Sequence, residues 1–100
     1  MATYFARVIT PHGKFFEDKV DFLSAPAAEG YLGILADHAP LVAMLAQGIL
    51  KIQKAGVDQF WAISSGVLEV DQNGEVLVLA DTALPGNSVE DARAKVNELH

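Results

Sequence analysis

Short apolar runs alternate with polar residues along most of the chain, and this pattern predicts β-strands. Each run is too short for a typical helix and ends at a turn rich in Gly, Pro, Asn or Ser. The predicted strands are Tyr4–Thr10, Lys19–Phe22, Gly30–Leu35, Leu41–Leu45, Ile49–Gln53, Phe60–Ser64, Val67–Val70 and Val76–Ala80. Strands this close together favour a mainly β fold, an antiparallel two-layer β-sandwich or flattened barrel followed by a short C-terminal helix.

The dipeptide Asn73-Gly74 is the strongest turn signal, because both residue types tolerate the positive φ of a two-residue type I′ hairpin turn. Such a turn predicts the register of the hairpin, with Val70 opposite Leu77. Burial should hold this register, since a slip of one residue turns every side chain to the other face. Further turns are predicted at Pro11–Gly13, Pro26, Gln47-Gly48, Ala55-Gly56 and Ser64–Gly66.

The hydrophobic period changes after Asp81. Leu84–Asn87 has the composition of a linker, and Ser88 with Asp91 resembles the capping box of a helix of about 11 residues. Its apolar side carries Val89, Ala92, Val96 and Leu99. A helix this short is marginal alone and must pack on another surface. The sequence therefore predicts a β domain over residues 1–84, and a linker with a short or truncated helix over residues 85–100.

The chain has 100 residues, of which 51% are apolar and 20% charged, so it is long enough for one globular core. Its formal net charge is −6, which argues against a nucleic-acid partner, because such partners are bound by clustered Lys and Arg. The absence of Cys excludes disulfides and thiolate metal sites. No apolar run approaches the roughly 18 residues that span a bilayer, so direct membrane insertion is not expected.

Asp37-His38-Ala39-Pro40 interrupts an otherwise apolar segment with two polar side chains and a proline. Proline fixes φ, lacks an N–H and biases the residue before it toward an extended conformation. The segment is therefore expected to form a rigid loop between two buried strands, with His38 pointing outward.

Several segments of the chain match segments of a known protein family in their order and spacing. They are Glu29-Gly30-x-x-Gly33-Ile34, His38-Ala39-Pro40-Leu41, Gly48-x-Leu50-x-Ile52, Ser65-Gly66-x-Leu68-Glu69-Val70, Val78–Ala83 and Val89–Ala94. Together they cover essentially the whole chain, and in this respect it resembles the epsilon subunit of F-type ATP synthases.

The resemblance implies a non-catalytic subunit without a cofactor at the foot of the rotor. It would couple ion translocation to ATP synthesis at the cytoplasmic face of the bacterial plasma membrane. Its partners would be the gamma subunit, the ring of c subunits and, indirectly, the alpha/beta catalytic hexamer. The residues implied to face gamma are Asp37, His38, Ala39, Pro40 and Leu41. Those implied to face the c ring are Glu29, Gly30, Tyr31 and Leu32.

On this resemblance, a charge placed at Pro40 or Leu41 should weaken gamma binding without unfolding the domain. The family's nucleotide motif is present only in the reduced form Val89-Glu90-x-x-Arg93-Ala94, which leaves Glu90 and Arg93 as nucleotide-binding candidates. The family usually continues into a second helix. Inhibition of ATP hydrolysis by the helical part is therefore expected to be weak or absent in this short form.

A second function class is a small β-barrel that binds a small ligand in a cleft beside His38. This function would require a closed pocket that holds His38 with a carboxylate partner. A zinc site of His12, His38 and His100 matches no known ligand spacing. The carboxylates of Glu17 and Asp21 are expected to form a solvated rim rather than an acid/base pair. The other candidates have structural roles: Ser64–Gly66 is expected to end a strand, and Phe60 and Trp61 to lie in the core.

Overall fold

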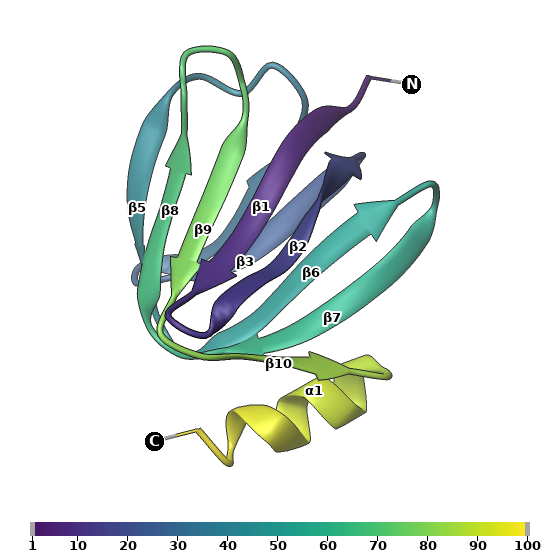
Figure 1. The fold of residues 1–100 in the computed structure, drawn as a ribbon, viewed down its shortest axis with the longest axis vertical. Coiled ribbons are helices and arrows are strands. Elements are labelled where there is room, and N and C mark those ends of the chain that lie inside the picture. The colour runs from purple at the N-terminus through teal and green to yellow at the C-terminus, as the bar shows by residue number, and fades with distance from the viewer. Residues whose placement is uncertain (1, 100) are drawn as a thin grey trace.

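Ten strands and one helix make up residues 2–99, the part of the chain that the computed structural model describes (Figure 1). The strands are β1 (Tyr4–Thr10), β2 (Gly13–Val20), β3 (Phe22–Ala27), β4 (Gly30–Ile34), β5 (Leu41–Leu45), β6 (Gly48–Lys54), β7 (Val57–Ile63), β8 (Gly66–Val70), β9 (Val76–Ala80) and β10 (Ala83–Gly86). The helix α1 spans Val89–Val96. The mainly β fold with a short C-terminal helix is thus confirmed.

The strands form one sheet that folds over on itself into a nearly closed barrel (Figure 1). Its order is β10-β7-β6-β3-β5-β8-β9-β1-β2, with β4 paired to β3. Consecutive strands joined by tight turns pair antiparallel, as predicted. Among the described strands, β1 and β9 pair in parallel, which the sequence pattern did not predict. These two strands are far apart in the chain, so no hairpin turn dictates their relative direction.

The inward side chains of the strands form a single core. The fully buried larger ones are Val8, Val20, Leu23, Ile34, Leu50, Ile52, Ile63, Leu68, Val70 and Val78. The Tyr4 hydroxyl donates a hydrogen bond to the carbonyl of Ile34 at 2.7 Å and so ties β1 to β4, while burial raises the pKa of this hydroxyl. Trp61 is also buried and lies near Phe15, with ring centroids 6.2 Å apart, which confirms the core assignment of the tryptophan.

The register of the β8–β9 hairpin differs from the predicted one by one residue. Val70 lies opposite Val76 rather than Leu77. The turn contains three residues instead of two, because the Asp71 carbonyl accepts from the Gly74 N–H and only Gly74 among the turn residues has a positive φ, of 79°. The inward residues of β9 are therefore its valines, and its leucines face outward. The two-residue turn with two positive φ values forms instead at the predicted turn Ala55-Gly56.

Three other boundaries differ from the sequence-based ones. The predicted strand Lys19–Phe22 is divided at Asp21, where β2 ends and β3 begins. Pro26 lies inside β3 and not at its end, and its carbonyl accepts a hydrogen bond from the N–H of Ala46. The segment assigned to a linker forms most of β10, which pairs with β7. Pro85 lies on β10, an edge strand, and Pro26 lies where the partner of β3 changes from β6 to β5. Proline is tolerated at such positions because a regular ladder does not require its missing N–H there.

Helix α1 begins as predicted but is shorter. The Ser88 hydroxyl accepts a hydrogen bond from the Asp91 N–H at 3.1 Å, and Asp91 forms an ion pair with Lys95 at 3.2 Å. The Asp91 carboxylate accepts from the Asn87 N–H, one residue before the cap that a capping box would use. This contact, followed by the Lys95 ammonium, lowers the pKa of Asp91.

The helix packs on the β domain. Ala92 is fully buried and sits so close to Gly86 that a Cβ on Gly86 would lie 2.8 Å from the Ala92 Cβ. At the C-terminal end of the helix, the Gln47 side-chain amide donates to the Val96 carbonyl at 2.6 Å. The helix is therefore held near its middle on β10 and at its C-terminal end on the β5–β6 connection.

The first prediction concerns Gly66 of β8, which lies close to the backbone of β9. A Cβ at this position would lie 2.0 Å from the Leu79 carbonyl oxygen, so backbone must move to admit it. We expect Gly66→Ala to lower the free energy of unfolding by about 3 kcal/mol in chemical denaturation. The adjacent Val67→Ala, whose side chain is half-exposed, should cost less than about 1 kcal/mol. Equal effects of the two substitutions would contradict this account of the close approach.

Candidate docking surface

A row of apolar side chains crosses four neighbouring strands on the outer face of the sheet. Met44 of β5 is opposite Val67 of β8, Val67 is opposite Leu79 of β9, and Leu79 is opposite Ile9 of β1. Directly opposite side chains on one face touch, so these residues form a continuous surface. Met44 is 64% exposed and Leu79 is 45% exposed. We call Met44, Val67, Leu79 and Ile9 the apolar row.

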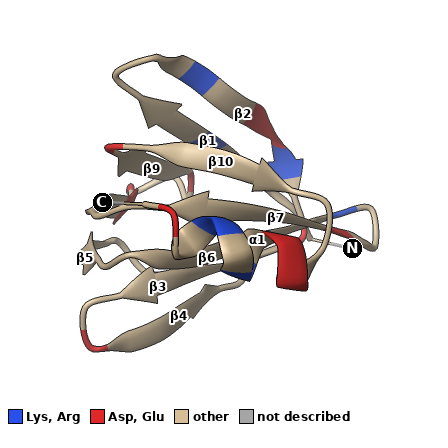
Figure 2. Ribbon diagram, turned by 90° about the horizontal axis from the view of Figure 1, so that it is seen from below, with Lys and Arg blue, Asp and Glu red and all other residues tan. Residues whose placement is uncertain are grey.

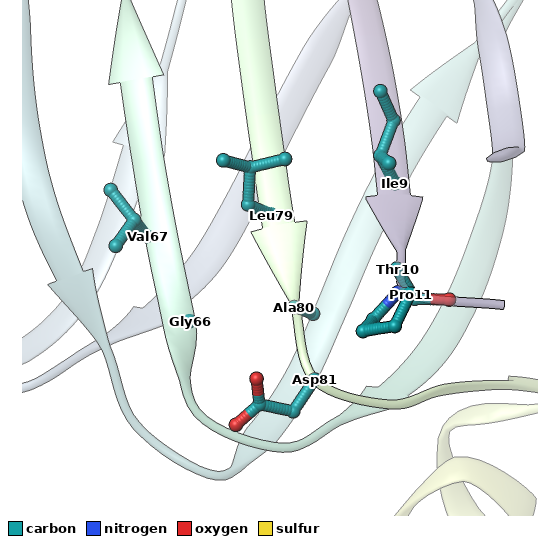
Figure 3. A pocket seen from close by; sticks show the side chains of 8 residues that line it. All are labelled: Ile9, Thr10, Pro11, Gly66, Val67, Leu79, Ala80 and Asp81. Carbon is teal, nitrogen blue, oxygen red and sulfur yellow. The ribbon is translucent and has the colours of Figure 1, made fainter. Parts of the chain in front are cut away.

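A shallow pocket of about 380 Å³ lies beside the apolar row, where β1 and β9 end and β8 begins (Figure 3). Its lining residues are Ile9, Thr10, Pro11, Gly66, Val67, Leu79, Ala80 and Asp81. The Asp81 carboxylate accepts a hydrogen bond from the Ser65 hydroxyl at 3.2 Å. The lining offers one carboxylate and the hydroxyl of Thr10, which accepts a hydrogen bond from the His12 N–H, and it contains no His or Lys that could act as a base. Such a pocket suits an apolar side chain of a partner rather than a reaction.

Polar and charged residues border the apolar row on its β1–β2 side. The Arg7 guanidinium donates to the Glu17 carboxylate at 2.7 Å, and Lys14 also pairs with Glu17. Lys14 first and Arg7 second hold the pKa of Glu17 below its ordinary value. Glu17 is therefore a charge-paired rim residue, while Asp21 accepts from the Gly56 N–H. Basic and acidic residues colour β2 and α1 in Figure 2, whereas β5 is uncharged.

The loop before β5 lies at the opposite end of that strand from Met44. Asp37 has a positive φ of 64°, and the His38 Nδ1 atom is 2.7 Å from the Ala39 carbonyl oxygen. Asp37 lines a polar pocket of about 250 Å³ with residues of the β8–β9 turn, and His38 is not part of its lining. This geometry does not provide the closed cleft that a ligand site beside His38 would need.

Leu41 differs from the rest of this loop because its side chain packs against the core. Pro40 and Ala39 are exposed. A charge at Leu41 would therefore reduce stability, contrary to the expectation that it would affect only a partner contact. The exposed Val42, one residue further, is the corresponding outward position of β5.

Comparison with known proteins identifies the family. Residues 3–86 match the profile described as "ATP synthase, Delta/Epsilon chain, beta-sandwich domain". The chain belongs to this family. The chain named ATP synthase epsilon chain from Syntrophomonas wolfei is 45% identical over 95 residues, which are 94% of this chain and 69% of the relative. Its namesake from Gloeobacter violaceus is 38% identical over 89 residues, which are 89% of this chain and 67% of the relative.

Solved structures agree with the fold of this delta/epsilon family member. A chain of the Euglena gracilis mitochondrial ATP synthase, in a structure of OSCP/F1/c-ring, superposes with a TM-score of 0.79 at 26% identity. This match covers 85% of the present chain and 54% of the Euglena chain. A Tetrahymena thermophila chain, from a structure of the central stalk/c-ring, gives a TM-score of 0.73 at 16% identity and shows likeness of fold alone. The present chain spans about two thirds of the length of its curated relatives.

The other positions that the family resemblance singles out lie at the β3–β4 turn. Gly30 has a φ of 130°, and Glu29 is exposed beside it. Tyr31 is 63% exposed, yet its hydroxyl accepts a hydrogen bond from the Ile49 N–H at 3.2 Å, so its ring lies over β6. Leu32 packs against the core. Glu29, Gly30 and Tyr31 are thus exposed at this turn.

The two nucleotide-binding candidates, Glu90 and Arg93, do not line the same pocket. Arg93 lines an open pocket of about 290 Å³ with Lys51, Phe60 and Tyr31, and Glu90 is exposed outside that lining. Over residues 2–99 there is no cluster of three or more His, Asp or Glu that could hold a metal ion. His100, the third member of the suggested zinc site, lies outside the described residues. No helix in this part of the chain is both long and apolar enough to cross a membrane.

Sequence reasoning missed the apolar row. Its members were assigned to strands, but the register error placed Leu79 in the core, and no strand was predicted over the first six residues of β2, Gly13–Asp18. The signal was present in β9, where valine and leucine alternate. Valine packs well in the interior of a pleated sheet, so either face of Val76–Ala80 could have been buried.

The ion pairs at the rim give the second prediction. Because the pKa of Glu17 is lowered on folding, its stabilising contribution is present above the ordinary glutamate pKa and is lost as the pH falls through the folded-state value. An NMR pH titration of the Glu17 carboxyl should show a midpoint below the ordinary value of about 4.3. Lys14→Gln should raise that midpoint, whereas Lys19→Gln on the same strand should not. A parent midpoint at the ordinary value would contradict the pairing.

Proposed function

We propose that the chain is an epsilon-type central-stalk subunit of F-type ATP synthase that binds the gamma subunit through the apolar row. The exposed row Met44–Val67–Leu79–Ile9 carries the proposal, because an uninterrupted apolar surface on a charged domain is expected to be covered by a partner. The subunit has a mechanical role: it transmits torque between the ion-driven c ring and gamma, and catalysis takes place elsewhere, in the alpha/beta hexamer. Membership of the delta/epsilon family supports this role.

The loop Asp37–Leu41 extends the proposed gamma contact beyond the apolar row. Burying a large apolar side chain contributes about 1.5–3 kcal/mol before the costs of association. A stable interface also needs roughly 800 Å² on each partner, which is more than four side chains supply. The loop adds a rim at the other end of β5, formed by Asp37, His38, Ala39 and Pro40. Leu41, which follows them, packs against the core and so holds the loop on the domain.

The β3–β4 turn is the proposed contact with the c ring. Glu29, Gly30 and Tyr31 are exposed there, and Leu32 anchors the turn in the core. The Tyr31 hydroxyl accepts a hydrogen bond from the Ile49 N–H, which holds the tyrosine side chain in place. The aromatic ring of Tyr31 therefore offers the c ring a preorganised contact surface. The subunit would then be a peripheral protein at the cytoplasmic face of the bacterial plasma membrane, and its contact with the c ring would hold it there.

We propose coupling, and not inhibition of ATP hydrolysis, as the role of the described residues. Helix α1 is held on the sheet by Gln47 and by the close contact of Ala92 with Gly86. We place the boundary between the β domain and the helical part after residue 86 rather than after residue 84, because β10 ends at Gly86 and pairs with β7 in the sheet.

The third prediction tests the apolar row. Met44→Glu and Leu79→Glu should each weaken binding to the purified gamma subunit of the same ATP synthase at least tenfold in calorimetric titration, since a charge would be buried without a partner. Val57→Glu is the matched control. Val57 is 63% exposed, close to the 64% of Met44, but lies on β7, outside the row.

Thermal unfolding of the three variants separates binding from stability. All three should unfold within a few degrees of the parent, because each replaced side chain faces solvent. Parent-like gamma binding by both Met44→Glu and Leu79→Glu would contradict the proposed interface. So would an equal loss in Val57→Glu.

A further inference from the structure

Strand β5 has an open edge over most of its length. On one side it pairs with β8 along all of Leu41–Leu45. On the other side the only strand contact, within the described residues, is at Leu45, where Ala27 of β3 is its partner. Two hydrogen bonds flank this point, from the Ala28 N–H to the Met44 carbonyl and from the Ala46 N–H to the Pro26 carbonyl. β3 ends at Ala27 and the chain turns into β4, whereas the earlier residues Phe22–Ser24 of β3 pair with β6.

The backbone groups of Val42 point to this open edge. The N–H and C=O of one residue in a strand point to the same side, and alternate residues point the same way. Because the Met44 carbonyl bonds to β3, the N–H and C=O of Val42 and the N–H of Met44 must also point away from β8. No hydrogen bond to these three groups is found within residues 2–99.

A pocket of about 360 Å³ lies beside the open edge. It is lined by Ala27, Ala28, Glu29, Val42, Ala43 and Met44. β5 carries no charged residue, and Val42 is 68% exposed. Natural sheets usually protect such an edge with charges, a bulge or a covering segment. An uncharged edge with free backbone groups and space beside it is instead the geometry that accepts an added strand.

We propose that the open edge of β5 binds an extended segment of the gamma subunit by strand addition. This inference rests on the proposed function and adds the mode of recognition. The added strand hydrogen-bonds to Val42 and Met44, and its outward side chains continue the apolar row beyond Met44. The edge and the row meet at Met44, so a single partner segment can cover both.

Charge specifies one feature of the added segment. Glu29 lies at the rim of the pocket, and Glu69 of β8 is directly opposite Val42 on the outer face. Neither carboxylate forms an ion pair within the described residues. The segment should therefore be apolar at alternate positions and should carry a Lys or Arg long enough to reach across Val42 to Glu69.

Hydrogen exchange of single amides tests the inference directly. The chain is exchanged alone and in complex with the purified gamma subunit, then separated and measured by NMR. The amides of Val42 and Met44 should exchange at least tenfold more slowly in the complex. The amide of Ala43, which points to β8 in both states, is the internal control and should change less.

The outcomes separate this inference from the proposed function. If gamma binds and the amides of Val42 and Met44 exchange as in the free chain, strand addition is wrong while the proposed function stands. If gamma does not bind, both are wrong. If these amides are protected in the free chain through self-association, seen by sedimentation, the occupant of the edge is a second copy and the assignment to gamma is overturned.

A pair of substitutions at Val42 gives an independent readout. Val42→Pro removes the N–H at the edge, where a proline is tolerated because no bond within the chain is lost. Val42→Ala keeps the N–H and removes part of the side chain. We expect Val42→Pro to weaken gamma binding at least tenfold and Val42→Ala less than threefold. Equal binding by two folded variants would overturn the inference. Should Val42→Pro unfold, the exchange measurement on the parent chain decides.

Discussion

The register of the β8–β9 hairpin determines which residues this protein buries and which it presents. The Asp71 carboxylate fixes that register, because one of its oxygens accepts from the N–H of Asn73 at 2.8 Å and from that of Glu75 at 3.0 Å. Side chains alternate in and out along both strands, so this three-residue turn points Val78 into the core and Leu79 to the outside. A tighter turn would reverse that choice, and the apolar row would not exist.

The outer face depends in turn on how closely the strands approach at the base of the hairpin. Gly66 lets the Leu79 carbonyl lie where any side chain would collide with it, and Gly66 also lines the pocket beside the row. β3 pairs with β5 at one position alone within the described residues, Ala27 with Leu45. The rest of that edge of β5 is therefore unpaired, and β5 carries no charged residue. The proposed apolar contact and the proposed strand addition are therefore two results of one sheet geometry.

Much of this fold could be predicted from the sequence, since short strands, the Ala55-Gly56 turn and the Ser88 cap are local signals. The β8–β9 register is a local feature that was nevertheless missed, because the Asn73-Gly74 pair indicated a tighter turn than the one that the Asp71 side chain stabilises. The other missing parts depend on non-local contacts. Nothing local shows that β1 pairs in parallel with β9, or that Leu84–Gly86 pairs with β7. For the site, sequence placed the loop Asp37–Leu41 at the surface. It could not place the apolar row, because a row across four strands exists only once every register is known.

The most direct test of the central claim uses the methyl group of Met44. Met44 lies in the apolar row where it meets the open edge, and its methyl signal can be followed by NMR while a soluble paramagnetic agent reports solvent access. On addition of the gamma subunit, the account predicts that the Met44 methyl loses most of its solvent-induced relaxation. A gamma complex in which this methyl stays as accessible as in the free chain would contradict the account.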